Sequence, residues 1–323
     1  MQLNRRDTLR TALSLLAGSA LPGLSRAQPH YPEGVIKITI WTPAGGGADG
    51  AMRIVGQKLT ESLGNTVVVE SRPGANGAIA IQSIAKAPPD GLNLLYINSS
   101  ILSNLVLMSN PGYKLSELSP VCLMVMTPIA IGVRASLGVS TLQEYVALAR
   151  SRPGKLSYGS YGQGSGGHFI GELLNLSAGI DVLHVPYKGE APAIQDLLGG
   201  QIDAAITSIG AVSRQPGKII PLAVSSDVRF KGYRDVPTFA EAGYPQVYMP
   251  GWGAVYAPAK TPKPVLDRLA AEMSRIVMLP EVATRMLDFG FESVGWDPAK
   301  TTAFTDQQLP LIRKLVESGR VKI

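Results

Sequence analysis

The stretch VIKITIWTPAGGGADG, residues 35–50, decides the fold. Residues 35–42 form an apolar run that predicts a β-strand, and three glycines then lead into residues 48–63, whose apolar side chains recur at helical spacing. Gly64 predicts the end of this helix. A second strand, a second helix and a third strand follow within residues 66–98, and this βαβαβ pattern implies a mostly parallel sheet with crossover helices.

The chain repeats this alternation in a second region. A long apolar segment, residues 120–134, is broken by Pro128 and predicts a strand that passes between two lobes. Helices and strands alternate again up to Ser225, whereas the residues after Pro262 predict only helices, which we expect to pack back on the first lobe. The predicted fold class is therefore α/β, with two lobes joined by a two-strand hinge: lobe 1 from residues 28–128 and 250–323, and lobe 2 from residues 129–249. The cleft of such a hinged protein is the expected ligand site.

The first 27 residues predict an export signal. A basic start precedes an apolar stretch over residues 11–24 and a small-residue ending, so we expect cleavage near Ala27 and a periplasmic location. The apolar stretch is shorter than the roughly 20 residues that a membrane-spanning helix needs. Residues 4–10 resemble a twin-arginine signal, although Asn4 and Thr8 depart from the usual pattern, and the general secretory route stays an alternative.

Composition argues against several classes of function. Four Arg and one Asp within residues 1–27 account for half of the formal net charge of +6, and no basic run is interleaved with aromatic residues, so we expect no nucleic-acid partner. The single cysteine, Cys122, lies in an apolar run and is expected to be a buried thiol. Histidines occur only at positions 30, 168 and 184, without metal-ligand spacing, so we expect neither a metal nor a cofactor.

The first glycine loop, residues 42–49, joins the first strand to the first helix. Its glycines remove the side chains that would keep a ligand away from the backbone amides at the start of the helix, which makes the loop a candidate anion site. The loop lacks the Lys-Ser/Thr ending of a triphosphate site. A flexible turn is the alternative for the loop, and a helix N-cap is the alternative for Asp49.

The second glycine loop, residues 159–168, takes the matching position in lobe 2. If the lobes close, both helix N-termini point at one cleft and favour a carboxylate, and the hydroxyls of Ser160 and Ser165 add hydrogen bonds. The alternative is an exported hydrolase-like or cofactor-binding enzyme that uses this loop, with Ser165 activated by His168 or His184. The loop misses G-x-S-x-G by one residue, and the acidic residue of a dinucleotide site is missing after the next strand, so we predict no enzyme.

Several spaced motifs carry a family resemblance. RPGKLSYGS at residues 152–160, Gly164-Ser165 with His168, HVPYKG at residues 184–189 and GQID at residues 200–203 resemble the Bug-type receptors of tripartite tricarboxylate transporters. Pro43 with residues 45–49, and the stretches at 70–75, 87–91, 236–243 and Trp252, match as well. The resemblance implies a type II periplasmic-binding-protein fold and a small carboxylate ligand, whether an organic di- or tricarboxylate, an acidic amino acid or an aromatic acid. It also implies delivery to inner-membrane permease subunits or to a sensor protein, and we expect a monomer.

The resemblance also suggests ligand-binding residues. Both glycine loops would hold the ligand carboxylate, partly through water, and Tyr187 and Asp203 would come near the cleft. From the residues alone, Tyr187 can equally be half-buried packing and Asp203 a strand-end cap. Asn76 and the segment 103–113 depart from the family pattern, which leaves the selectivity of lobe 1 open. The predicted ligand-binding residues are Ala44, Gly45, Gly46, Gly47, Asp49, Ser99, Ser160, Gly162, Gly164, Ser165, Gly166, His168, Tyr187 and Asp203.

Overall fold

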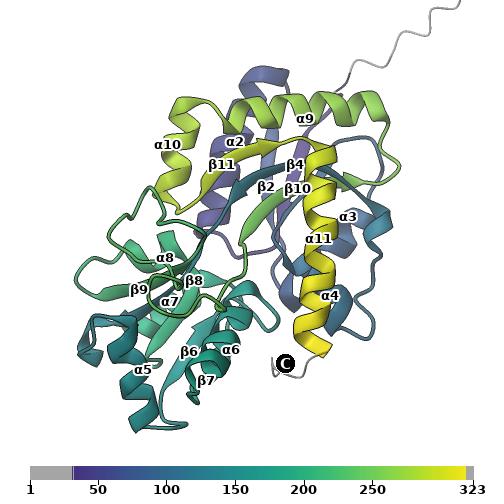
Figure 1. Ribbon diagram of the computed structural model, residues 1–323. Coiled ribbons are helices and arrows are strands. Elements are labelled where there is room, and N and C mark those ends of the chain that lie inside the picture. The colour runs from purple at the N-terminus through teal and green to yellow at the C-terminus, as the bar shows by residue number, and fades with distance from the viewer. Residues whose placement is uncertain (1–30, 32, 318–323) are drawn as a thin grey trace, which may run out of the picture. The chain divides into compact units, whose positions relative to one another are not determined.

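The computed structural model describes residues 31 and 33–317, so the predicted export signal lies outside the described residues. From Gly34 on, the chain forms one compact unit that holds two β-sheets with helices on their faces, which confirms the predicted α/β class (Figure 1). None of the helices described is long and apolar enough to cross a bilayer.

The first sheet belongs to lobe 1 and has the strand order β11-β4-β10-β3-β1-β2. The strands β2, β1 and β3 are parallel, whereas β10, β4 and β11 run antiparallel to their neighbours. The strand bounds are β1 Ile36–Ile40, β2 Val67–Ser71, β3 Asn93–Ile97, β4 Leu118–Met126, β10 Trp252–Pro258 and β11 Glu292–Trp296.

Six helices accompany this sheet. The helix that follows the first glycine loop packs on β2, and the C-terminal helix packs on β4 (Figure 1). The helix after the first glycine loop is capped by Gly64 in the left-handed conformation, as the sequence predicts. The helix bounds are α2 Gly47–Leu63, α3 Ala78–Ala85, α4 Ser100–Leu107, α9 Lys263–Val277, α10 Pro280–Asp288 and α11 Pro298–Glu317, with short 3-10 turns at Ala75–Gly77 and Leu115–Glu117.

The second sheet belongs to lobe 2 and has the strand order β7-β6-β8-β5-β9. β6 pairs in parallel with β7 and β8, and β5 is antiparallel to β8 and β9. The strand bounds are β5 Ile129–Arg134, β6 Ser157–Ser160, β7 Leu183–Pro186, β8 Ala204–Ser208 and β9 Ile219–Ser225. The helix bounds are α5 Leu142–Ser151, α6 Gly166–Ala178, α7 Glu190–Leu198 and α8 Ile209–Ser213, with a 3-10 turn at Ala135–Leu137.

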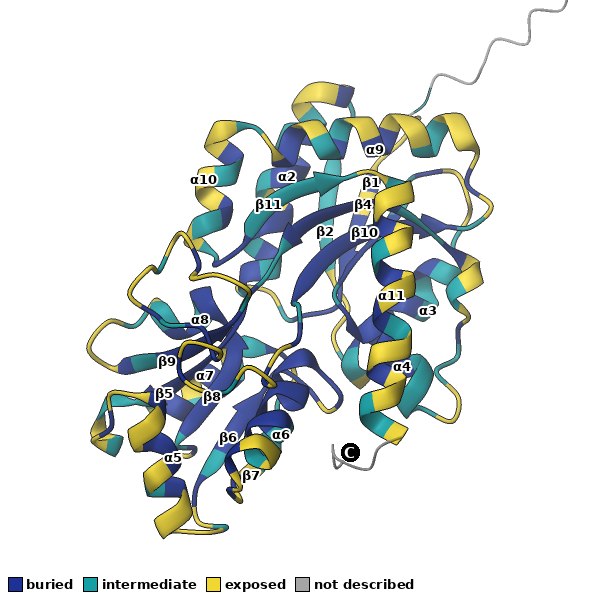
Figure 2. Ribbon diagram, viewed as in Figure 1, coloured by how far each residue is buried: buried dark blue, intermediate teal, exposed yellow. Residues whose placement is uncertain are grey.

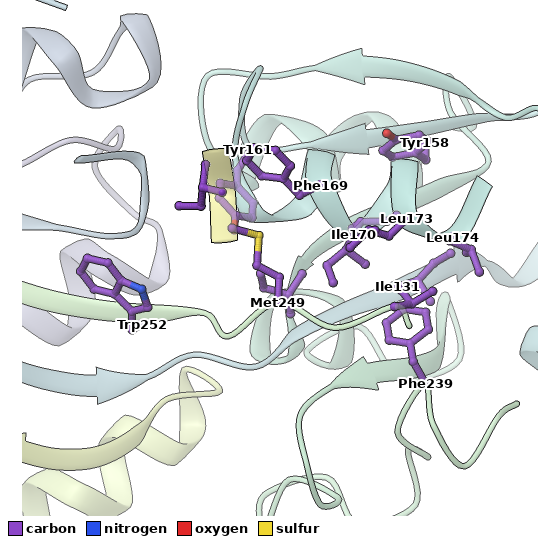
Figure 3. Close-up of a cluster of buried hydrophobic side chains, with 14 of the residues drawn as sticks. Ile131, Tyr158, Tyr161, Phe169, Ile170, Leu173, Leu174, Phe239, Met249 and Trp252 are labelled. Atoms are coloured by element: carbon purple, nitrogen blue, oxygen red, sulfur yellow. The ribbon is translucent and has the colours of Figure 1, made fainter. Parts of the chain in front are cut away.

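Two adjacent crossings join the sheets. The chain passes from β4 to β5 through Thr127, and it returns to β10 through Gly251, whose carbonyl accepts the Thr127 amide at 2.8 Å. A Cβ atom on Gly251 would lie 2.0 Å from the Thr127 carbonyl oxygen, so only glycine allows this approach. In Figure 3, Met249 lies between the Trp252 indole and buried side chains of lobe 2, so the apolar core continues along the crossing.

Burial follows the predicted alternation of apolar runs. The central strands are buried, and the helices expose their outer faces (Figure 2). Cys122 is fully buried in β4, as expected, and burial raises the pKa of its thiol to about 11. The stabilising contribution of such burial is roughly 25 cal/mol per Å² of apolar surface.

Two expectations for lobe 1 are wrong. The residues after Pro262 are not all helical, because β11 pairs with β4 at the edge of the sheet. Every residue of β11 is only half buried, so the strand lacks a run of buried apolar residues that would mark it in the sequence. The sheet is also not mostly parallel, because the chain enters it again from lobe 2 through β10 and runs antiparallel to β3.

Candidate functional site

A cleft lies between the lobes at the carboxyl ends of β1, β3, β6 and β8. In open α/β sheets, ligands bind beyond the carboxyl ends of the strands. Both lobes supply its walls, which consist of Trp41, Thr42, Pro43, Gly46, Gly47, Ala48, Tyr96, Asn98, Thr127, Ile129, Tyr161, Glu190, Ala191, Ser208, Trp252 and Phe291.

The first glycine loop brings the start of α2 into this cleft. Gly46 is the N-cap residue and makes no side-chain capping bond, and it lines the cleft together with Gly47 and Ala48. The first amides of an α-helix have no partner within the helix, and the helix dipole adds a partial positive charge. This end of α2 is therefore suited to hold an anion.

The rest of the first glycine loop has a supporting role. Asp49 lies in the first turn of α2, which begins two residues before it, so it is not the N-cap residue. Its Oδ2 accepts the Gly45 amide at 3.0 Å, and Arg53 Nη2 lies 2.9 Å from Oδ1. Burial opposes ionisation, but the bonds from Arg53 and Gly45 hold the pKa of Asp49 below its usual value. Asp49 thus holds the loop in place. Ala44 and Gly45 are exposed and do not line the cleft.

The polar groups of the second glycine loop bind one another. Ser165 is the N-cap residue of α6, and its Oγ accepts the His168 amide at 3.3 Å. Ser160 Oγ donates to the Gly162 carbonyl at 2.9 Å, and His168 Nδ1 accepts the Gly164 amide at 3.0 Å. Ser160, Ser165 and His168 are all buried and line no part of the main cleft. We therefore correct the expectation that the two serine hydroxyls face the ligand directly.

Tyr161 covers the N-terminus of α6. Its hydroxyl oxygen lies against the first turn of α6, since a Cβ atom on Gly166 would lie 2.6 Å from it. The expectation that both helix N-termini open into one cleft is thus wrong for α6, because a tyrosine ring stands in between. Tyr161 itself lines the cleft, and its hydroxyl hydrogen remains to be donated.

The remaining glycines of the second loop contact lobe 1. A Cβ atom on Gly162 would lie 3.1 Å from Asn76 Oδ1, and one on Gly164 would lie 2.2 Å from Leu107 Cδ1. Asn76 has a left-handed backbone, which asparagine tolerates, and it donates to Asn104 Oδ1 at 3.0 Å. Gly162 and Gly164 therefore permit the lobes to meet beside the cleft.

Three other candidates lie away from the cleft lining. Tyr187 lines a neighbouring cleft, and its hydroxyl donates to Asp196 at 2.7 Å. Asp203 precedes β8, at the end opposite to the cleft, where it pairs with Arg134 at 2.8 Å. Ser99 is a buried N-cap residue of α4. The structure does not place these three residues beside Gly46 and Gly47. The contacts of Asp203 fit its alternative role as a strand-end cap.

Most of the residues that line the cleft are not predicted from the sequence. Asn98, Tyr161 and Ser208 each stand at the end of a strand, so the rule of carboxyl ends could have found them. Two buried polar atoms in the lining, Trp252 Nε1 and Thr42 Oγ1, have no hydrogen-bond partner. Buried polar atoms are rarely left without a partner, so these two atoms are suited to contact a ligand.

The geometry does not favour the enzyme alternative. Ser165 Oγ donates to Ser160 Oγ at 3.4 Å, and Ser160, whose hydroxyl contacts the His184 ring, is fully buried. A substrate therefore has no access to that hydroxyl. In the part of the chain that the structure describes, no group of three or more His, Cys, Asp or Glu side chains could hold a metal ion.

The chain resembles known proteins over most of its length. The family model described as "Tripartite tricarboxylate transporter family receptor" matches residues 51–319. A UPF0065 protein of Bordetella bronchiseptica is 35% identical over 319 residues, which are 98% of this chain and 93% of that protein. The solved structure of the periplasmic binding protein BugD is 32% identical, with a TM-score of 0.85 over 90% of this chain and 99% of that one. An R. palustris protein solved with adipate is 28% identical, with a TM-score of 0.86 over 89% of this chain and 97% of that one.

Proposed function

Because the chain belongs to the tripartite tricarboxylate transporter receptor family, which confirms the resemblance found in the sequence, we propose that it captures a small carboxylate in the periplasm for uptake. The proteins it resembles are solute-binding receptors, including one solved with adipate, and receptors release their ligands unchanged. No catalytic role is therefore proposed.

The observation that carries this proposal is the start of α2 in the cleft. Gly46, Gly47 and Ala48 present a helix N-terminus between two lobes, with Tyr161 opposite as a further donor. A carboxylate near a helix N-terminus gains about 0.3 to 1 kcal/mol when exposed and up to about 2 kcal/mol when partly buried. A ligand bound in the cleft would contact both proposed lobes and so hold them together. These lobes are residues 28–128 with 250–323, and residues 129–249.

A ligand screen tests the proposed function. Purified protein is titrated with mono-, di- and tricarboxylates and with acidic and aromatic amino acids, and the melting temperature is recorded. We expect a saturable rise with at least one carboxylate, which NMR then shows to be chemically unchanged. A preference for cations, or no response to any acid, would contradict the proposal, and conversion of the acid would favour the enzyme alternative.

Partners need a separate test. We propose that the receptor delivers its ligand as a monomer to inner-membrane permease subunits, because one chain supplies the whole cleft. Deleting the gene should abolish uptake of the labelled ligand by cells. Normal uptake with loss of ligand-dependent transcription would indicate a sensor partner instead, and a dimer in size-exclusion chromatography would contradict the monomer.

We propose export as a folded protein by the twin-arginine route, with residues 1–27 as the signal. Arg5 and Arg6 form the arginine pair of the motif. Replacing both by lysine keeps the positive charge but removes the pair, and we expect the precursor to stay in the cytoplasm. Continued export of that variant would assign the chain to the general secretory route.

A further inference from the structure

A carboxyl side chain lines the proposed carboxylate site. Glu190 is the first residue of α7, and it reaches the main cleft from lobe 2. Its Oε1 accepts the Ser208 amide at 2.7 Å, and its Oε2 accepts the Ser208 hydroxyl at 2.9 Å. Both oxygens are thus held by a residue that itself lines the cleft, so the carboxylate has a fixed position.

Aromatic residues line the same cleft as Glu190. Tyr96 and Tyr161 lie close enough to feel the charge of Glu190, and Trp41 and Trp252 complete the walls of the same cleft. The faces of tyrosine and tryptophan rings attract cations. A carboxylate within aromatic walls is therefore suited to a positively charged nitrogen.

The protein itself provides little positive charge here. Glu190 forms no salt bridge within the described part of the chain, and Arg214, whose charge acts on it, is exposed and lies 5.3 Å over the Phe289 ring. Burial raises the pKa of Glu190, against the opposing effects of the Ser208 bonds and of Arg214. A cation brought by the ligand would offset the cost of burying this charge.

Resting on the proposed function, we infer that the ligand is a zwitterion, with its carboxylate at the start of α2 and its positively charged nitrogen beside Glu190. Arg214 lies near the carboxylate position, since its Nη2 would be 3.4 Å from a Cβ atom on Gly47. Two further polar atoms of residues that line this cleft, Trp252 Nε1 and Thr42 Oγ1, have no hydrogen-bond partner among the described residues. Glu190 is then the residue that separates amino acids and similar zwitterions from plain di- and tricarboxylates.

Matched pairs of ligands test the inference in the unaltered protein. Succinate is compared with aspartate, glutarate with 4-aminobutyrate, and benzoate with 4-(aminomethyl)benzoate, by calorimetric titration at pH 7. We expect the nitrogen-bearing member of the best-binding pair to bind at least tenfold more tightly. Acidification should weaken that member and strengthen its partner, because protonation removes the negative charge of Glu190.

Substitution then assigns the effect to one side chain. In Glu190→Gln the zwitterion should lose at least tenfold in affinity, while the plain acid gains, because the charge that repels it is gone. Glu61→Gln, an exposed residue of α2, is the matched control and should keep the wild-type ratio.

The outcomes separate the two proposals. If the plain acids bind more tightly than the zwitterions, or if Glu190→Gln leaves the ratio unchanged, the inference is overturned and the carboxylate receptor stands. If neither class binds, the proposed function fails. The ratio of the affinities for the zwitterion and the plain acid in the wild-type protein, and its change with pH, test the inference even if Glu190→Gln does not fold.

Discussion

Ser160 Oγ lies 2.7 Å from His184 Nε2, and the His184 ring stacks on the His168 ring with centroids 3.9 Å apart. This contact ties the end of β6 to β7 and to the first turn of α6. The polar groups of the second glycine loop form hydrogen bonds with one another, and for this reason they line no part of the cleft. The loop therefore acts as a support for Tyr161, which does reach the cleft.

Acid should destabilise the protein through His184. Burial, aided by the adjacent His168, lowers the pKa of His184 to about 3, whereas an unfolded histidine titrates near 6.5. Between these values the unfolded chain takes up a proton that the folded chain does not, so stability falls as pH falls below about 6.5. Unfolding by urea at pH 7 and pH 5 should show a smaller loss in His184→Gln than in the wild type. Equal losses would mean that His184 is protonated in the folded protein.

The Tyr161 hydroxyl should stabilise the fold. In Tyr161→Phe the first amides of α6 lose a polar atom beside them, since a Cβ atom on Gly166 would lie 2.6 Å from the Tyr161 oxygen, and leaving buried donors without partners costs about 1 to 3 kcal/mol. Tyr113→Phe is the comparison, because its hydroxyl donates to a single carbonyl, that of Ile101, at 2.7 Å. Urea unfolding should show the larger loss for Tyr161→Phe, and a smaller loss than in Tyr113→Phe would contradict the proposed capping.

The indole of Trp252 should report ligand binding. Its N–H has no partner in the cleft, so Trp252→Phe should weaken the ligand about tenfold, the equivalent of roughly one hydrogen bond. The ligand-induced change in tryptophan fluorescence should shrink in the same variant. Trp296→Phe serves as the control, since Trp296 packs on Phe304 and Lys300 outside the cleft. Unchanged affinity in Trp252→Phe would remove this residue from the site.

Much of the fold is predictable from apolar periodicity. The strand Ile36–Ile40 and the helix Gly47–Leu63 lie close to their predicted ranges, residues 35–42 and 48–63, because each is a clear run with Pro or Gly near its ends. The strand β11 is missed because it is short and half buried at a sheet edge. Periodicity reports burial on one face, and an edge strand without such a face gives no signal.

The binding site is only partly predictable. The glycines at positions 46 and 47 are found because a glycine loop between a strand and a helix has a direct physical use. The second loop follows the same pattern, yet Tyr161 folds over its helix, and no local pattern predicts where an aromatic side chain will turn. Glu190 escapes for a related reason, since its place in the cleft depends on the pairing of β8 and on Ser208.

The most direct test of the account places a charge at the start of α2. Asp and Asn are about equally good N-cap residues, so Gly46→Asp and Gly46→Asn should both keep the stability of the wild type. In calorimetric titrations with the best carboxylate, we predict that Gly46→Asp binds at least tenfold more weakly than Gly46→Asn, because only Asp repels the ligand. Equal affinities in the two variants would show that the acidic group of the ligand lies elsewhere.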